Sequence, residues 1–271
     1  EFKKTTAYKD FQKINKVAST FSVPKPNIES EDGKVKRKTT TSKKVFKLKS
    51  FYYAVASIVI ALSLFTFITS NKIITADFGE KLLTELPDGS KVHLNAGSEI
   101  SYKRFFWERN KIVYFEGEAY FDIVKSDGFK VISASAQVEV LGTTFNIIDR
   151  NKHYEIVCYV GKVAVQKTNV LEKHTLEKGD KITIQKEQIS SEKIIERSPN
   201  WLNNMSVFKN KPLSVVLASL ERQYNIKIKR NTVDVSKIFT GSFVHTNLES
   251  ALKTTLPVMG IRYEVSKNQK T

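Results

Sequence analysis

Hydrophobic and polar positions follow a different pattern in each part of the chain, and one part carries no charge at all. Residues 50–71 are 22 consecutive uncharged positions, and their centre reads FYYAVASIVIALSLFTFIT. Because a helix rises about 1.5 Å per residue, roughly 20 apolar residues span the hydrocarbon core of a bilayer. The run predicts a transmembrane helix over residues 51–70. The alternatives are a buried core helix, which usually has a polar stripe, and a cleavable signal peptide, which starts nearer the N-terminus.

A second apolar pattern, nearer the N-terminus, has helical spacing. Its apolar side chains are Phe11, Ile14, Val17, Ala18 and Phe21. This spacing predicts a short amphipathic helix over residues 9–22. Pro24 and Pro26 end it, and residues 29–42 form a polar linker. Such a short helix has no core of its own, so we expect it to dock onto a partner. Because the chain begins with Glu1 rather than Met, we also expect that further residues precede it.

Beyond residue 78 the period of the pattern changes from 3.6 to 2. Short segments rich in β-branched and aromatic residues are separated by turn sequences such as Pro-Asp-Gly and Lys-Gly-Asp. These segments are Leu82–Leu86, Val92–Leu94, Ile112–Phe115, Tyr120–Val124, Phe129–Ser133, Val138–Leu141, Phe145–Ile148, Glu155–Tyr159, Lys162–Val165 and Lys181–Ile184. No helix-length pattern interrupts them. The sequence therefore predicts an all-β domain over residues 78–195, folded as a barrel, a sandwich or a solenoid-like stack.

The C-terminal part contains an internal repeat. Shifting the sequence by 35 positions superimposes Phe208 on Phe243, Leu213 on Leu248, Leu217 on Leu252, Ile226 on Ile261, and Ile228 on Tyr263. Each copy reads as strand, helix and strand, with Pro212 at the first helical position of one copy and Asn247 as the N-cap of the other. Neither copy can bury its own helix face. Together they predict a small α/β domain over residues 201–267.

The distribution of charge orients the predicted membrane helix. The chain has 44 Lys and Arg against 28 Asp and Glu, a net charge of +16, and residues 1–50 hold 14 of the basic and 5 of the acidic residues. Residues 72–91, beyond the apolar run, balance their lysines with acidic residues. The positive-inside rule places the N-terminus in the cytoplasm and about 200 residues across the membrane. A nucleic-acid-binding arm is the alternative interpretation, but few aromatic residues interleave with the basic ones.

Few side chains are candidates for catalysis. Glu116, Glu118 and Asp122 lie close together in the sequence, and paired carboxylates can hydrolyse glycosides. Gly117, between the two glutamates, indicates a turn instead. The single cysteine, Cys158, has an apolar setting typical of a core residue. The histidines lack metal-ligand spacing: His93, His153, His174 and His245. We expect no enzyme activity, no cofactor and no metal.

Several sequence runs resemble a known family. The runs LPDGSKVHLNAGSEISY, YFEGEAYFDI, VLGTTFNI and VGKVAV look like the periplasmic signature of FecR-type transmembrane anti-sigma factors. The run WLNNMSVFKNKPLSVVLASLERQYNIKIK, followed by FTGSF, is similar to the domain that ends many Bacteroidota members and to secretin-and-TonB N-terminal domains. The resemblance covers residues 82–265 in the expected order. The cytoplasmic part is shorter than the family usually has.

The resemblance implies a regulatory mechanism. The cytoplasmic segment would hold an extracytoplasmic-function sigma factor, and we assign this contact to Phe11, Ile14 and Phe21. The part beyond the inner membrane would lie in the periplasm and sense the signalling domain of a TonB-dependent outer-membrane transporter. Exposed strand edges suit recognition by strand addition, in which backbone hydrogen bonds supply the affinity. The edge residues expected to bind the transporter are Ile226, Lys227, Ile228, Lys229, Ile261, Arg262 and Tyr263.

One dipeptide could carry chemistry. Some FecR-like proteins are thought to cleave themselves at a Gly-Thr pair that matches Gly142 and Thr143. A threonine hydroxyl can attack the preceding carbonyl of a strained backbone and form an ester. The alternative, which we favour, is a bulge or tight turn that needs glycine for its backbone alone.

A second function remains open at this point. A membrane-anchored carbohydrate-binding protein or an envelope scaffold would share the same layout. Its expected mark is a line of exposed aromatic side chains on the β domain, and the candidates are Tyr102, Phe105, Phe106 and Trp107.

Overall fold

The computed structural model describes residues 6–20, 22, 46–69, 71–105, 107–125, 127–151, 153–185, 188–230 and 233–266. The chain divides into two compact units, Glu1–Ile60 and Ala61–Thr271. In the first unit the predicted amphipathic helix is α1 (Thr6–Ser19), which has no buried residue. Phe21, both prolines and the predicted linker lie outside the described residues.

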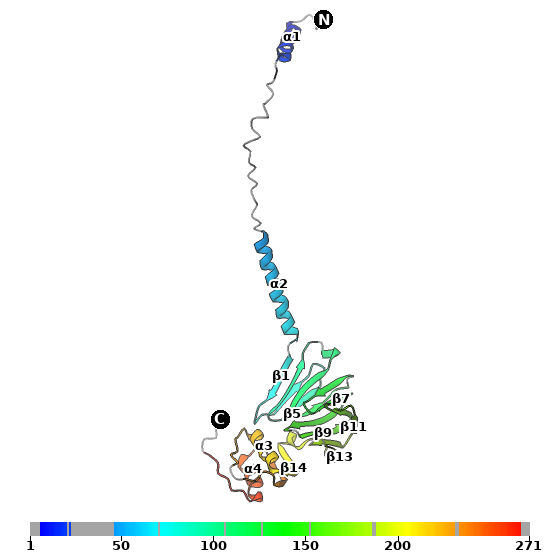
Figure 1. Ribbon diagram of the computed structural model, residues 1–271, viewed down its shortest axis with the longest axis vertical. Helices are drawn as coiled ribbons and strands as arrows, with labels where there is room; N and C mark the ends of the chain where they lie inside the picture. The colour runs from blue at the N-terminus through cyan, green and yellow to red at the C-terminus, as the bar shows by residue number, and fades with distance from the viewer. Residues whose placement is uncertain are drawn as a thin grey trace. The chain divides into compact units, whose positions relative to one another are not determined.

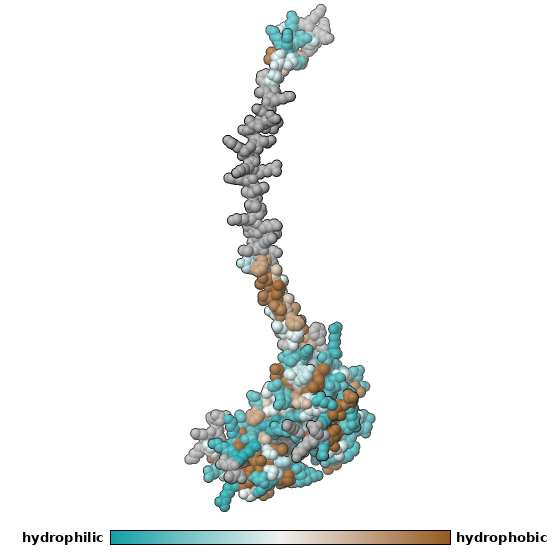
Figure 2. All heavy atoms as spheres, viewed as in Figure 1, coloured by the Kyte–Doolittle hydropathy of each residue, from teal (hydrophilic) through white to brown (hydrophobic). Residues whose placement is uncertain are grey.

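The apolar run forms the long helix α2 (Phe46–Thr69). Among the described residues, one stretch is long and apolar enough to cross a membrane: Phe51–Thr69, with a mean hydropathy of 2.1. None of this stretch is buried, which does not fit a core helix. Figure 2 shows hydrophobic side chains along α2. The helix is therefore compatible with a single-pass membrane protein.

Thirteen strands of the described residues form one sheet in the second unit (Figure 1). They are β1 (Asn71–Ala76), β2 (Leu82–Glu85), β3 (Lys91–Leu94), β4 (Ser98–Lys103), β5 (Ile112–Asp122), β6 (Phe129–Ile132), β7 (Ala136–Val140), β8 (Thr144–Arg150), β9 (His153–Val160), β10 (Lys162–Lys167), β11 (Lys173–Glu177), β12 (Asp180–Gln185) and β13 (Gln188–Lys193). A short 3-10 helix, η3 (Trp107–Arg109), lies between β4 and β5. Among the described strands, β5 and β6 are the one parallel pair.

Strand β5 belongs to both halves of this sheet. Its first part pairs with β4 and β6, and its second part, from Gly117 onward, pairs with β3 and β8. Gly117 has a φ of +111°, and a Cβ atom at this position would lie 2.7 Å from the Cα of Ser98. Only glycine fits this conformation and this close approach. The strand changes partners at Gly117, and the sheet bends around one core.

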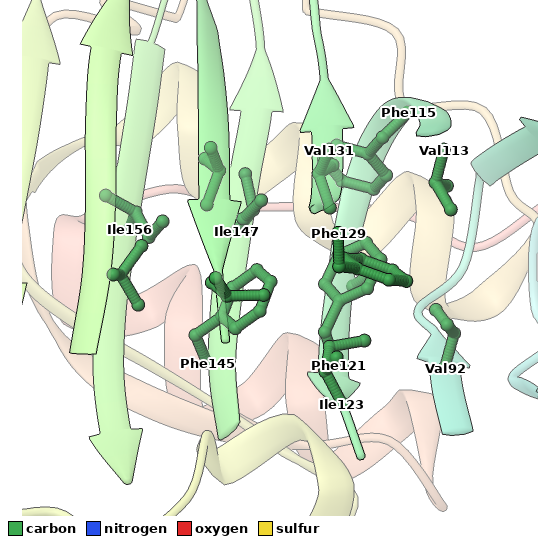
Figure 3. Close-up of a cluster of buried hydrophobic side chains, with 14 of the residues drawn as sticks. Val92, Val113, Phe115, Phe121, Ile123, Phe129, Val131, Phe145, Ile147 and Ile156 are labelled. Atoms are coloured by element: carbon green, nitrogen blue, oxygen red, sulfur yellow. The ribbon is translucent and has the colours of Figure 1, made fainter. Parts of the chain in front are cut away.

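The core collects apolar side chains from both halves of the sheet (Figure 3). Phe121 of β5 stacks on Phe145 of β8 with ring centroids 5.0 Å apart. Phe115, from the other half of β5, meets the edge of Phe121 at 5.8 Å. A single cluster that joins both halves is the core of a half-barrel, so the predicted mostly-β domain is confirmed and the solenoid-like alternative is wrong.

The prediction from the sequence is wrong for several strands of this sheet. Residues 112–115 and 120–124, predicted as two strands, are the single strand β5, and the predicted turn at Gly117 is wrong. Strands β1, β4, β11 and β13 are absent from the predicted segments. All six residues of β13 are exposed, so this edge strand has no apolar alternation to detect.

A smaller fold follows η4 (Asn200–Asn203). Its elements are β14 (Met205–Pro212), α3 (Leu213–Tyr224), β15 (Ile238–Val244), α4 (Leu248–Thr255) and the 3-10 helix η5 (Pro257–Met259). β14 pairs with β15, and both helices contribute to one core with residues of these strands. Asn247 caps α4 as predicted, because its side chain accepts a hydrogen bond from the N–H of Ser250. Pro212 is the N-cap of α3, whereas the sequence predicts it as the first helical residue.

The final strand of each repeat copy is not formed. Residues 226–230 and 261–266 are not part of any described strand. Local contacts take up some of the backbone donors: the N–H groups of Ile226 and Ile228 donate to the backbone and side-chain oxygens of Glu221 at 3.2 and 2.9 Å. The repeat prediction is therefore correct for the first strand and the helix of each copy and wrong for the last strand.

Candidate functional site

The face of α1 that we assign to the sigma factor is exposed. Phe11 is 63% exposed, and Ile14 and Val17 are each 68% exposed. A spacing of three residues places them along one side of the helix. Phe21, the third assigned residue, lies outside the described residues. Burying such a stripe against a docked partner would be favourable by about 25 cal/mol per Å² of apolar surface removed from water.

Gly142 and Thr143 lie in the turn between β7 and β8. Gly142 has a φ of +122°, and a Cβ atom there would lie 2.9 Å from the Cα of Lys125. The Thr143 hydroxyl is buried and donates to the carbonyl oxygen of Lys162 at 2.8 Å. The register of β8 against β9 shifts directly afterwards, at Thr144. This is the geometry of a bulge, and it supplies no acid or base to the hydroxyl among the described contacts.

The three candidate carboxylates have different environments: Glu116 and Asp122 are exposed, and Glu118 is half-buried. Asp122 accepts a hydrogen bond from the hydroxyl of Thr144 at 3.1 Å. Glu118 accepts one from Nδ2 of Asn95 at 2.8 Å, and burial raises its pKa. Cys158 is fully buried, as predicted, and burial raises the pKa of its thiol to about 11. These environments favour structural roles for Glu118 and Cys158.

The prediction that the candidate aromatic side chains form an exposed line, as expected of a carbohydrate-binding protein, is wrong. Tyr102 and Trp107 are only 2% and 3% exposed, and their rings meet at 5.3 Å inside the core. Phe105 is partly exposed, and Phe106 lies outside the described residues. Sequence alone could not separate core aromatics from surface aromatics here, because the connection after β4 has no regular period.

The segments assigned to the transporter keep the alternation that the sequence predicts. Lys227, Lys229 and Arg262 are exposed, whereas Ile228 and Ile261 pack against the core of the small fold. Ile226 and Tyr263, the remaining assigned residues, are half-buried. No described contact engages the backbone N–H of Lys227, Lys229 or Arg262. These donors are therefore open to a new hydrogen-bonding partner.

A polar cluster that the sequence did not reveal joins the small fold to the β domain. Nε2 of Gln223 in α3 donates to Oδ1 of Asn95 at 2.9 Å, and Asn95 in turn donates to Glu118. Arg150 and Arg222 add positive charge beside this carboxylate, Arg150 from β8 and Arg222 from α3. Burial lowers the pKa of Arg150 to about 10. A half-buried carboxylate that is hydrogen-bonded to Asn95 and lies near two cations favours one docked arrangement.

A second ionic cluster lies along the same junction. Lys211 of β14 and Lys181 of β12 approach the Glu155 carboxylate at 3.4 and 3.1 Å, and His153 approaches it at 3.7 Å. Burial alone would raise the pKa of Glu155, but these three partners hold it at about 2. Nearby, Nε1 of Trp201 donates to Oδ1 of Asn146 at 3.1 Å. No motif predicts the contacts of Lys181 and Lys211 with Glu155 or of Trp201 with Asn146, since each joins residues far apart in the chain.

A half-barrel and a small α/β fold, joined by the hydrogen bonds of Asn95 with Gln223 and of Asn146 with Trp201, are the two folded parts that known families can be compared with. The family model "FecR protein" matches residues 72–164, and the model "FecR, C-terminal" matches residues 205–271. Together the two models match more than half of the chain. The chain therefore belongs to the FecR family of anti-sigma factors. Membership implies a sigma factor as a partner, and nothing in the described residues shows catalytic activity.

Solved structures give the same result. Two crystal structures of a candidate anti-sigma factor from Parabacteroides distasonis ATCC 8503 are similar to this chain. The first has 28% identity and a TM-score of 0.66, and the alignment covers 73% of this chain and 96% of the other. The second has 29% identity and a TM-score of 0.65, and the alignment covers 72% and 95%. A search of curated proteins finds no match.

Proposed function

We propose that this chain is a single-pass inner-membrane anti-sigma factor whose N-terminal segment lies in the cytoplasm and binds an extracytoplasmic-function sigma factor. Its half-barrel and small fold lie in the periplasm and sense the signalling domain of a TonB-dependent outer-membrane transporter. The charge difference across α2 supports this orientation, because basic residues concentrate before the helix.

The observation that carries the proposal is the exposed apolar face of α1. A helix that buries none of its own residues has no stabilising core, yet Phe11 and Ile14 repeat at helical spacing. This pattern is typical of a helix that is stabilised when it docks into an apolar groove of a partner. The family gives the partner's class, a sigma factor.

Replacing Phe11, Ile14 and Phe21 together with Ala tests the sigma-factor contact. We expect the triple variant of the full chain to lose co-purification with its sigma factor and to release that factor's target promoters. The matched control replaces Gln12 and Asn15, polar residues of the same helix, with Ala and should bind normally. Undiminished binding by the triple variant would exclude α1 from the contact.

Transporter sensing rests on the open backbone of the small fold. Residues 226–230 and 261–266 present exposed basic side chains beside apolar ones that pack on the core. A partner strand could pair with either segment through its N–H and C=O groups. The polar clusters around Glu118 and Glu155 would then transmit the docking of a partner to the half-barrel.

A further inference from the structure

We propose that the end of β4 and the connection from β4 to β5, residues 103–105 and 107–111, form a membrane-surface contact that binds the headgroups of anionic phospholipids. The inference rests on the proposed role of α2 as a membrane span. The connection contains four cationic side chains and one acidic side chain. The cationic residues are Lys103, Arg104, Arg109 and Lys111.

Strand register brings this connection to the end of the apolar helix. α2 ends at Thr69 and β1 begins at Asn71, so at most about 8 Å of chain separates them. β1 pairs with β4 in an antiparallel register that sets Asn71 opposite Lys103. The end of β4, and the connection that follows it, therefore lie beside the point where the chain leaves the helix.

A ring contact supports the same placement. Phe105 meets Phe67, which lies in the last turn of α2, with ring centroids 5.0 Å apart. Because Phe67 belongs to the apolar stretch Phe51–Thr69, the contact places Phe105 at the end of the proposed membrane span. Trp107 holds the connection in place, since it is buried and contacts Tyr102 and Phe129 at 5.3 and 6.0 Å.

The exposed charges at this level fit phosphate groups. Lys103, Arg104 and Arg109 are exposed. Arg104 also lines a shallow surface hollow with Lys72, and Nζ of Lys72 lies 6.0 Å from the ring centre of Tyr102. Glu85, Leu86 and Pro87 also line this hollow, so one carboxylate lies among its two cations. Guanidinium and ammonium groups bind phosphate oxygens strongly, and the bilayer surface is the nearest source of them.

Lipid is a better partner here than a soluble acidic protein. A surface tethered by a few residues to a membrane span meets headgroups at high effective concentration. Each cation that reaches an anionic surface should raise the equilibrium constant for docking about fivefold. The contact would hold the half-barrel at a fixed tilt to the membrane. A domain attached only by a flexible hinge would have no fixed tilt.

The test uses the full chain in vesicles that contain a headgroup spin-labelled quencher lipid. A fluorophore on Asn110→Cys reports on the connection, one on Ser63→Cys reports on α2, and one on Ser191→Cys reports on β13, at the far end of the strand order. Cys158 is buried, so the engineered cysteine takes the label. We expect several-fold stronger quenching at residue 110 than at residue 191, and an increase when phosphatidylglycerol is added to phosphatidylcholine.

Charge removal gives the second measurement. The variant Lys103→Gln/Arg104→Gln should lose most of the increase that phosphatidylglycerol causes at residue 110. The matched control, Lys178→Gln/Lys209→Gln, removes two exposed charges elsewhere and should keep it. Equal quenching at residues 110 and 191, with a label at residue 63 that is shielded from water inside the bilayer, would overturn the surface contact while leaving the span intact.

Two other results have distinct meanings. A label at residue 63 that remains in water would overturn the membrane span itself, and the proposed function with it. Quenching at residue 110 that ignores both phosphatidylglycerol and the Gln substitutions would overturn the headgroup assignment, because contact without charge dependence needs no phosphate.

Discussion

Gln223 and Asn95 are separated by 128 positions in the chain, yet their side chains share a buried hydrogen bond of 2.9 Å. This bond connects α3 of the small fold to the loop after β3, and Asn95 passes the contact on to Glu118. The two parts recognised by separate family models are thus joined by a specific polar junction.

We predict that Gln223→Ala weakens this junction. The substitution removes one hydrogen bond and leaves Glu118 and its partners less well packed, at a cost of about 1–2 kcal/mol. Protease accessibility of the segment between β13 and β14 should rise. Gln185→Ala, which removes an exposed glutamine of β12, is the control and should change neither stability nor cleavage. If both variants behave alike, the bond does not hold the folds together.

The Glu155 cluster predicts an acid-sensitive contribution to stability. The folded-state pKa of Glu155 is about 2, below the ordinary value of 4.5, so the carboxylate stabilises the fold above pH 4.5 and this contribution is lost as the pH falls toward 2. The difference amounts to roughly 3 kcal/mol. In Glu155→Gln, the midpoint temperature of thermal unfolding should depend much less on pH between about 2 and 4.5. Glu192→Gln, at an exposed partner of Lys181, should leave the curve nearly unchanged.

Two glycine variants separate backbone strain from steric contact. Gly142→Ala must adopt a φ of +122° and bring a Cβ atom to 2.9 Å from Lys125, whereas Gly128→Ala needs a φ of +76° and meets nothing within 4 Å. We expect the first to lose about 2–4 kcal/mol and the second about 1 kcal/mol. Chemical denaturation measures both. Equal losses would mean that the turn relaxes around the new methyl group.

The same turn gives a prediction about self-cleavage. Because the Thr143 hydroxyl is bound to the carbonyl of Lys162, we expect the purified chain to keep its full mass of 30.9 kDa. Mass spectrometry over several days at neutral pH checks this. A fragment that begins at residue 143, absent from Thr143→Ala, would show that the bulge rearranges into a reactive conformation.

A proline pair tests strand addition. The N–H of Lys227 has no described partner, so Lys227→Pro should leave the small fold intact and abolish binding of the transporter's signalling domain. Lys227→Ala keeps the N–H and should bind almost normally. Circular dichroism verifies that both variants are folded. Arg262 offers the same comparison on the second segment; normal binding by folded proline variants at both positions would exclude recognition through these backbones.

Reporter fusions test the orientation. A reporter active only in the periplasm should be silent when fused before Phe51 and active when fused after Lys72, because the basic residues precede α2. The reversed pattern would contradict the proposed topology and move α1 away from the sigma factor.

Local patterns in the sequence were sufficient for several elements. The 22 uncharged residues at 50–71 were sufficient to predict the apolar stretch Phe51–Thr69 of α2, because length and apolarity are properties of a contiguous segment. The 35-residue repeat located β14, α3, β15 and α4, since a helix and the strand before it leave their periods in neighbouring residues. The burial of Cys158 followed from its apolar strand alone.

Only the tertiary structure decided the rest. Gly117 resembles a turn in the sequence, but Ser98 and the partner change along β5 make it the bend of a continuous strand. Residues 226–230 alternate like a strand, yet no neighbouring strand accepts them. Asn95 beside Glu118, the two lysines beside Glu155 and Phe67 beside Phe105 all come from distant segments. Local propensity acts within a few residues, whereas pairing, burial and charge neutralisation depend on which segments the folded chain brings together.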